Sequence, residues 1–77
     1  MTTDDDLTRA LANLNTGLDA LLSARQSVLL AEGQLTGAHH ARCTELGDKL
    51  NDAICFAWRL SKVVEGDRRA AAAEVRQ

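Results

Sequence analysis

Proline and tyrosine are absent from the 77-residue sequence, and phenylalanine and tryptophan occur once each. Because proline fixes φ and removes a backbone donor, its absence favours long uninterrupted helices. β-branched residues are also sparse, which counts against strands. The formal net charge is only −2, without the basic excess that is typical of nucleic-acid-binding proteins. The composition therefore predicts a helical protein and counts against nucleic acid as a partner.

Long apolar runs are missing as well. The longest, residues 28–31 and 53–58, are far too short to span a bilayer. A secretory signal would place basic residues before an apolar stretch, whereas residues 4–6 of this chain are all aspartate. Cys43 and Cys55 would lie about 18 Å apart along a shared helix, which is too far for a disulfide. We therefore expect two reduced cysteines in a cytoplasmic protein that has no membrane segment.

What the sequence does contain is a heptad pattern of apolar residues. One series recurs every seven residues and a second fills the interleaved positions, which is the spacing of helices that pack along a seam. The first series is Leu7, Leu14, Leu21, Val28 and Leu35, and the second begins with Leu11 and Leu18. Arg25 and Glu32 continue the second series. Either they set the register of the seam, or the seam has ended and both are exposed.

The best break in the pattern is the sequence Gly-Gln-Leu-Thr-Gly at residues 33–37. Gly33 suits the left-handed conformation that ends a helix, and Thr36 can cap the next one. The next seam is predicted at Cys43, Leu46, Leu50, Ala53, Ala57, Leu60 and Val64. We predict one helix over about residues 4–32, a turn at 33–36 and a second helix of similar length over about 37–65. Residues 67–76 form a tail or a short third helix, or else continue the second helix.

Two helices joined by a short turn predict an all-α fold, an antiparallel helical hairpin that forms one domain. Apolar residues outside the seam would remain exposed in a lone hairpin, and such patches mark interaction surfaces. We therefore expect two copies to pair as a homodimeric four-helix bundle. The expected interface residues are the small row Ala10, Gly17, Ala24 and Ala31 together with Leu22, Leu29, Ile54, Phe56, Trp58 and Arg59.

Candidate metal ligands cluster only at His39, His40 and Cys43. His39 and Cys43 share a helical face, and two copies could offer four nitrogen and sulfur ligands for zinc. Their spacing matches no common zinc motif, so we expect neither a metal nor a cofactor. The same pair is the only candidate for a nucleophile and a base, and it lacks a third orienting group. The sequence therefore predicts no catalytic residue.

These features predict a non-enzymatic protein–protein interaction module, a homodimeric regulator, adaptor or inhibitor of a larger protein. In such a module Trp58 is either an interface anchor with Arg59 at its rim or a core residue packed beside Ile54. Two alternatives stay open. One is a metal-binding helical protein that uses the ligands above. The other is a small nucleic-acid-binding bundle, for which the basic residues near the C-terminus are Arg68, Arg69 and Arg76.

Overall fold

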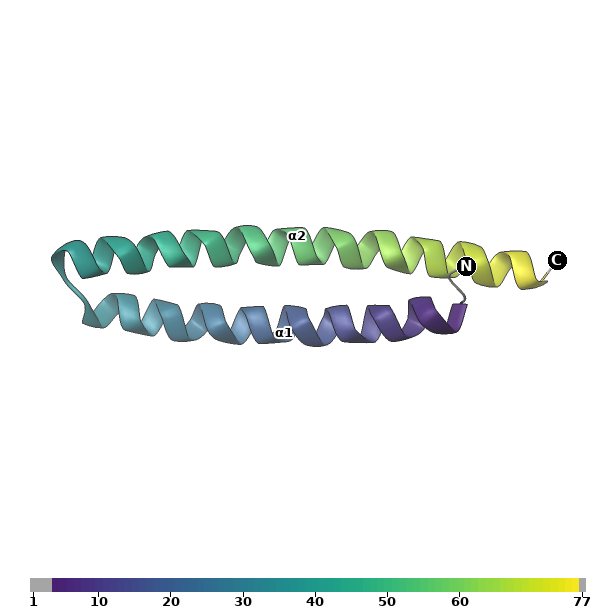
Figure 1. Cartoon of the computed structure of the whole chain (residues 1–77), viewed down its shortest axis with the longest axis horizontal. Coiled ribbons are helices and arrows are strands. Elements are labelled where there is room, and N and C mark those ends of the chain that lie inside the picture. The colour runs from purple at the N-terminus through teal and green to yellow at the C-terminus, as the bar shows by residue number, and fades with distance from the viewer. Residues whose placement is uncertain (1–3, 77) are drawn as a thin grey trace.

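The computed structural model describes residues 4–76, which form two α-helices, α1 (Asp4–Gln34) and α2 (Gly37–Arg76). The helices lie side by side and run in opposite directions, so the predicted all-α hairpin is confirmed (Figure 1). The molecule measures 61 × 16 × 14 Å and has a radius of gyration of 17.4 Å. A compact chain of this length would have a radius of about 11–12 Å. The hairpin is therefore a thin rod, one helix thick.

The turn between the helices consists of Leu35 and Thr36. The Leu35 N–H donates to the Glu32 carbonyl oxygen at 3.3 Å, which tightens the end of α1. The Thr36 carbonyl oxygen accepts the His40 N–H at 3.3 Å, which opens α2. The break therefore lies within the predicted segment.

The left-handed residue in this turn is Gly37, with a φ of 60°, and not Gly33 as predicted. Gly33 remains helical because α1 continues to Gln34. Two glycines flank the break, and either could have taken the left-handed conformation that a Cβ atom disfavours. The chain reverses at the second of them, which lengthens α1 by two residues relative to the prediction.

The second helix continues past Gly66 to Arg76, so no separate third helix forms. Arg69 Nη2 donates to Glu65 Oε1 at 2.6 Å, an i,i+4 ion pair that bridges the glycine. The helices are unequal, contrary to the prediction, because α2 has 40 residues and α1 has 31. The C-terminal end of α2 therefore projects past α1 (Figure 1), by roughly 10 Å. In the described part of the chain, neither helix combines the length and apolarity that a membrane span requires.

Along α1, the half-buried side chains are mainly those of the two predicted heptad series. Arg25 and Glu32 are half-buried with them, so the seam continues to the end of α1. Glu32 Oε1 lies 3.6 Å from His40 Nε2, across the turn. Leu35, the last member of the predicted series, is exposed in the turn itself.

The seam of α2 differs from the prediction in its second series. Cys43, Leu50, Ala57 and Val64 are in place, and the predicted Ala53 is half-buried. The second series itself consists of Gly47, Ile54, Ser61 and Arg68. The predicted Leu46 and Leu60 are exposed instead. A Cβ atom on Gly47 would lie 3.8 Å from Val28 Cγ1, so the two helices are close there. Leucine and valine already fill the α1 side of the seam, and small residues opposite them permit this approach.

Candidate interaction surfaces

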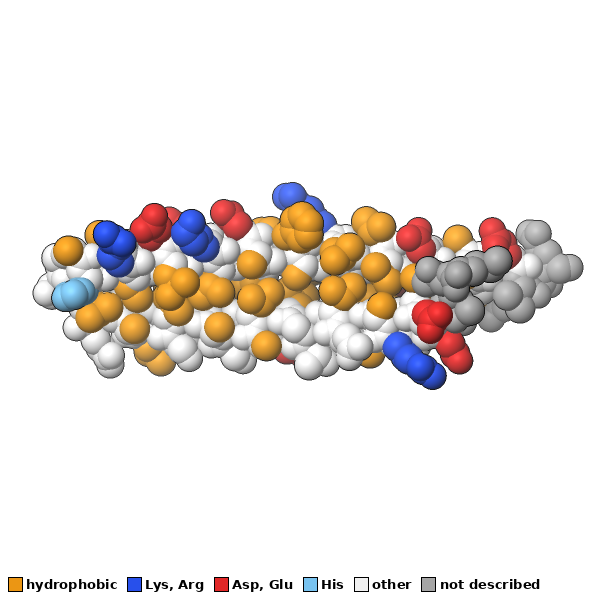
Figure 2. Space-filling model, in the orientation of Figure 1, with side chains coloured by type: hydrophobic (Ala, Val, Ile, Leu, Met, Phe, Trp, Pro, Cys, Tyr) orange, Lys and Arg blue, Asp and Glu red, His pale blue; other side chains and the backbone are white. Residues whose placement is uncertain are grey.

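The hairpin has no fully buried apolar side chain among its described residues. From residue 5 to residue 74, only Gly47 and Ser61 are buried, and Ser61 is 6% exposed. Apolar side chains follow the line between the helices and continue onto α2 (Figure 2). The large exposed ones are Leu22, Leu29, Leu30, Leu35, Leu46, Phe56, Trp58, Leu60 and Val63. The surface that is unusual in this molecule is therefore apolar. Apart from Leu30 and Leu35, its large side chains divide into two faces.

The first, called the Trp58 face, consists of Leu22 and Leu29 on α1 and Trp58 on α2. Leu22 and Trp58 line a shared hollow of about 380 Å³. The other residues around this hollow are Leu18, Ile54, Cys55 and Arg59. Because Leu18 and Ile54 are half-buried seam residues, they form the floor of the hollow. An apolar side chain from another protein could enter it.

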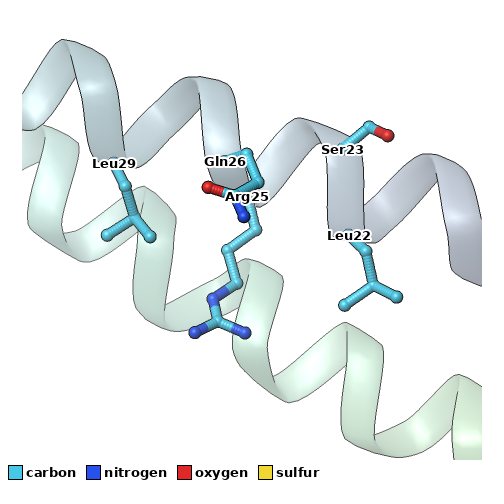
Figure 3. A pocket seen from close by; sticks show the side chains of 5 residues that line it. All are labelled: Leu22, Ser23, Arg25, Gln26 and Leu29. Atoms are coloured by element: carbon cyan, nitrogen blue, oxygen red, sulfur yellow. The ribbon is translucent and has the colours of Figure 1, made fainter.

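A second hollow of about 350 Å³ adjoins Leu22 on α1 and reaches Leu29 (Figure 3). Figure 3 shows Leu22, Arg25 and Leu29 projecting in the same direction, with the Arg25 side chain extended between the two leucines. Ser23 points away from them. This end of the Trp58 face therefore combines two apolar side chains with one cation.

Basic groups surround the indole of Trp58, which is 54% exposed. The Lys62 ammonium nitrogen lies 5.3 Å from the centre of the indole ring, within the range of a cation–π interaction. Arg59 lines the adjoining hollow. Tryptophan and arginine are the residue types that most often dominate binding energy at protein interfaces. The Trp58 face therefore has the composition of a surface that binds another protein.

The second surface, called the Phe56 face, lies on the other side of the seam. Its α2 residues are Leu46, Phe56, Leu60 and Val63. The last three are spaced three, four or seven apart, and Leu46 lies two heptads before Leu60, so all four share one side of the helix. Leu60 and Trp58 flank the α2 seam on opposite sides, and Gly17 and Leu22 do the same on α1. Since Leu22 and Trp58 share a hollow, Gly17 and Leu60 share the opposite face.

On α1, the Phe56 face carries only small or uncharged residues. Those at the matching heptad positions are Ala10, Asn13, Gly17, Ala20, Ala24, Ser27 and Ala31. Ala10, Asn13 and Gly17 line a hollow of about 610 Å³ that extends across the seam to Ala57. On the α2 side, Lys49 is the only charged residue at these positions between residues 46 and 63. The Phe56 face therefore pairs a bulky row with a small row.

The structure separates the interface residues predicted from the sequence into these two faces and the seam. Ala10, Gly17 and Ala24 are exposed on the Phe56 face, and Ala31 is half-buried at its end. The interface residues predicted on α2 are divided as well. Ile54 lies in the seam, while Phe56 and Trp58, two residues apart, point about 200° apart around α2. Sequence reasoning missed Leu46 and Leu60 as surface residues; the correct heptad register would have found both.

The candidate metal ligands point to different neighbours. The Cys43 thiol donates to the Val28 carbonyl oxygen in the seam at 3.4 Å, whereas His39 is exposed. His40 approaches Glu32 instead. Between residues 4 and 76, no three His, Cys, Asp or Glu side chains gather as they would around a metal ion. Both cysteines are free thiols.

The basic residues near the C-terminus also have neighbours within the chain. Arg69 pairs with Glu65. Arg68 lies in the seam, where its Nε is buried and has no hydrogen-bond partner among the described residues. The side chain of Arg76 lies outside the described part of the structure. Of the three arginines that kept the nucleic-acid alternative open, Arg68 is thus directed into the seam, whereas Arg69 is paired within α2 and stays exposed.

The chain has no significant similarity to any protein-family model, curated protein or solved structure with which it was compared. The two faces described above are therefore the basis on which its function is proposed.

Proposed function

We propose that the chain is a non-enzymatic protein–protein interaction module, a homodimeric regulator, adaptor or inhibitor of a larger protein that works as a four-helix bundle. The observation that carries this proposal is the absence of any buried apolar side chain between residues 5 and 74. Burying a large apolar side chain contributes about 1.5–3 kcal/mol, and a lone hairpin forgoes most of that gain. A second hairpin placed on one face would supply the missing half of a core.

The area of exposed surface supports the same proposal. The chain exposes 5929 Å² for a mass of 8.3 kDa. A compact monomer of that mass exposes about 4,600 Å², so this hairpin carries roughly 1,300 Å² more than it would as a globule. Pairing two copies through this surplus would bury about 2,600 Å² in total, which is within the range of obligate homodimers. A standard-sized contact of about 800 Å² per partner would leave part of the surplus exposed.

The presence of two opposite apolar faces supports binding to a second kind of protein. One face suffices for a dimer, and the other then remains open on each copy. The Trp58 face suits that role because the hollow beside Trp58 accepts one apolar side chain. Arg59 at that hollow and Arg25 between Leu22 and Leu29 can bind acidic or carbonyl oxygens of the partner.

Light scattering on the purified chain tests the central claim. We expect a mass twice that of the 8.3 kDa chain at micromolar concentration. A single species of 8.3 kDa that melts cooperatively would show that the hairpin is complete alone and would overturn the proposal. Trp58→Gln is the companion variant. This variant should leave the dimer mass and the helicity unchanged and abolish binding to the larger partner. Asp52→Asn, an exposed substitution on the same helix, should leave the dimer mass, the helicity and that binding unchanged.

A further inference from the structure

We propose that the second copy covers the Phe56 face, with a two-fold axis parallel to the helices, so that both turns lie at the same end of the bundle. This inference rests on the proposed function and names the face and the geometry that it requires. Its basis is the fit between the bulky row on α2 and the small row on α1.

Charge distinguishes the two faces. Interfaces of obligate homodimers are the more apolar class, and charged residues are depleted at their centres. On the Phe56 face, Lys49 is the only charge at the central α2 positions, and the α1 row has none. The Trp58 face has Arg25, Arg59 and Lys62 around its centre. Covering the Phe56 face therefore desolvates fewer charged groups than covering the Trp58 face would.

Shape selects the direction of the axis. Two hairpins stacked face to face can be related by an axis parallel to the helices or by one perpendicular to them. The parallel axis places α2 of each copy over α1 of the other, so that bulky side chains meet small ones. The perpendicular axis places α2 on α2 and α1 on α1, which crowds one half of the interface and leaves voids in the other. Close packing favours the first arrangement.

The positions of the side chains along the length of the hairpin, called their levels, agree with this arrangement. Val28 lies beside Cys43 and Gly47, which puts residue 28 level with about residue 45. Because both helices rise equally per residue, Phe56 is then level with Gly17. An axis parallel to the helices leaves every residue at its own level. The largest side chain of the bulky row therefore meets the one position of the small row that has no side chain.

The two leucines of the bulky row fit in the same way. Leu60 is level with Asn13, which stands between Ala10 and Gly17, and Leu46 is level with Ser27, which stands between Ala24 and Ala31. Each leucine of one copy would thus enter a hole bordered by one uncharged polar residue and two smaller residues of the other. This is the knobs-into-holes packing of four-helix bundles.

A substitution at Gly17 separates the dimer from the hairpin. A Cβ atom at Gly17 would meet nothing within 4 Å in the hairpin, and the same holds for Gly66. Both glycines are helical, so Gly17→Leu and Gly66→Leu should raise the helix stability alike. In the dimer, however, a leucine at 17 would occupy the space assigned to Phe56 of the second copy. We expect Gly17→Leu to weaken dimerisation at least about tenfold, and Gly66→Leu to leave it unchanged.

A distance between spin labels tests the direction of the axis. The labels are attached at Thr36→Cys in the turn, in a chain that also carries Cys43→Ala and Cys55→Ser. Turns at the same end predict an interlabel distance below about 25 Å, given helix spacings of about 8–10 Å. Turns at opposite ends of a rod 61 Å long would place the labels roughly 50–60 Å apart.

The outcomes separate this inference from the function on which it rests. A monomeric parent chain overturns both. A dimer that survives Gly17→Leu, or whose labels lie far apart, keeps the interaction module and overturns the assignment of the Phe56 face and its axis. A dimer that is lost with Gly17→Leu, is kept with Gly66→Leu and has labels close together supports the inference in full.

Discussion

Replacing Gly47 by alanine should stabilise the protein, because Gly47 is buried in the seam in a helical conformation. The added Cβ would lie 3.8 Å from Val28 Cγ1, which is an ordinary van der Waals contact. Helix propensity contributes about 1 kcal/mol for glycine to alanine, and burying the methyl group adds up to about 0.8 kcal/mol. The expected gain of about 1.5 kcal/mol corresponds to a rise in melting temperature of roughly 6–12 °C for a domain of this size.

Thermal melts followed by circular dichroism at one fixed protein concentration measure this change. Gly66→Ala is the matched control, since its Cβ meets nothing within 4 Å and reports helix propensity alone. Gly47→Ala should raise the melting temperature more than Gly66→Ala does, because it also gains the packing contribution. Gly47→Leu should lose about 1–3 kcal/mol by forcing the helices apart. A melting temperature that falls with Gly47→Ala would refute the register in which Gly47 faces Val28.

Two further predictions concern the seam. Ser61→Ala should raise the free energy of unfolding by about 1–2 kcal/mol, because it removes a buried hydroxyl whose oxygen has no hydrogen-bond partner among residues 4–76; a loss of stability in denaturant titrations would mean that this hydroxyl is satisfied in the native protein. Cys55, which is exposed, should react with a thiol reagent under native conditions well before Cys43, which is half-buried and bonded to a carbonyl oxygen. Comparing single Cys→Ser variants assigns the two rates, and equal rates would contradict the packing of Cys43.

The sequence was sufficient to predict the all-α hairpin and the seam of α1, because leucine at heptad spacing gives α1 only one apolar face of that kind. It was not sufficient for α2. There, Cys43, Leu50, Ala57 and Val64 fit two registers, one completed by Leu46 and Leu60 and the other by Gly47 and Ser61. Hydrophobicity favours the first, whereas close approach to Val28 favours the second. That choice depends on the volume of the opposite helix, which a pattern within one helix does not contain.

The same ambiguity limited what could be predicted about the interaction surfaces. The register error placed Leu46 and Leu60 in the core, which concealed the row that they form beside Phe56. Four members of the small row on α1, Ala10, Gly17, Ala24 and Ala31, were predicted because they recur every seven residues in a helix whose register was correct. Phe56 and Trp58 were grouped by their closeness in sequence, although neighbours two apart on a helix point in nearly opposite directions.

The two-residue turn at Leu35 and Thr36 also determines how the chain can fold. A short connection makes the first contacts between the helices local, as with Glu32 and His40, which are eight positions apart. Each later pair closes only a slightly larger loop than the one before it, so the helices can join progressively from the turn with little added entropy cost. Chains dominated by such local contacts fold in microseconds to milliseconds. In the proposed dimer, the second copy would arrive by diffusion at a rate set by concentration, so each hairpin would form before its apolar faces are covered.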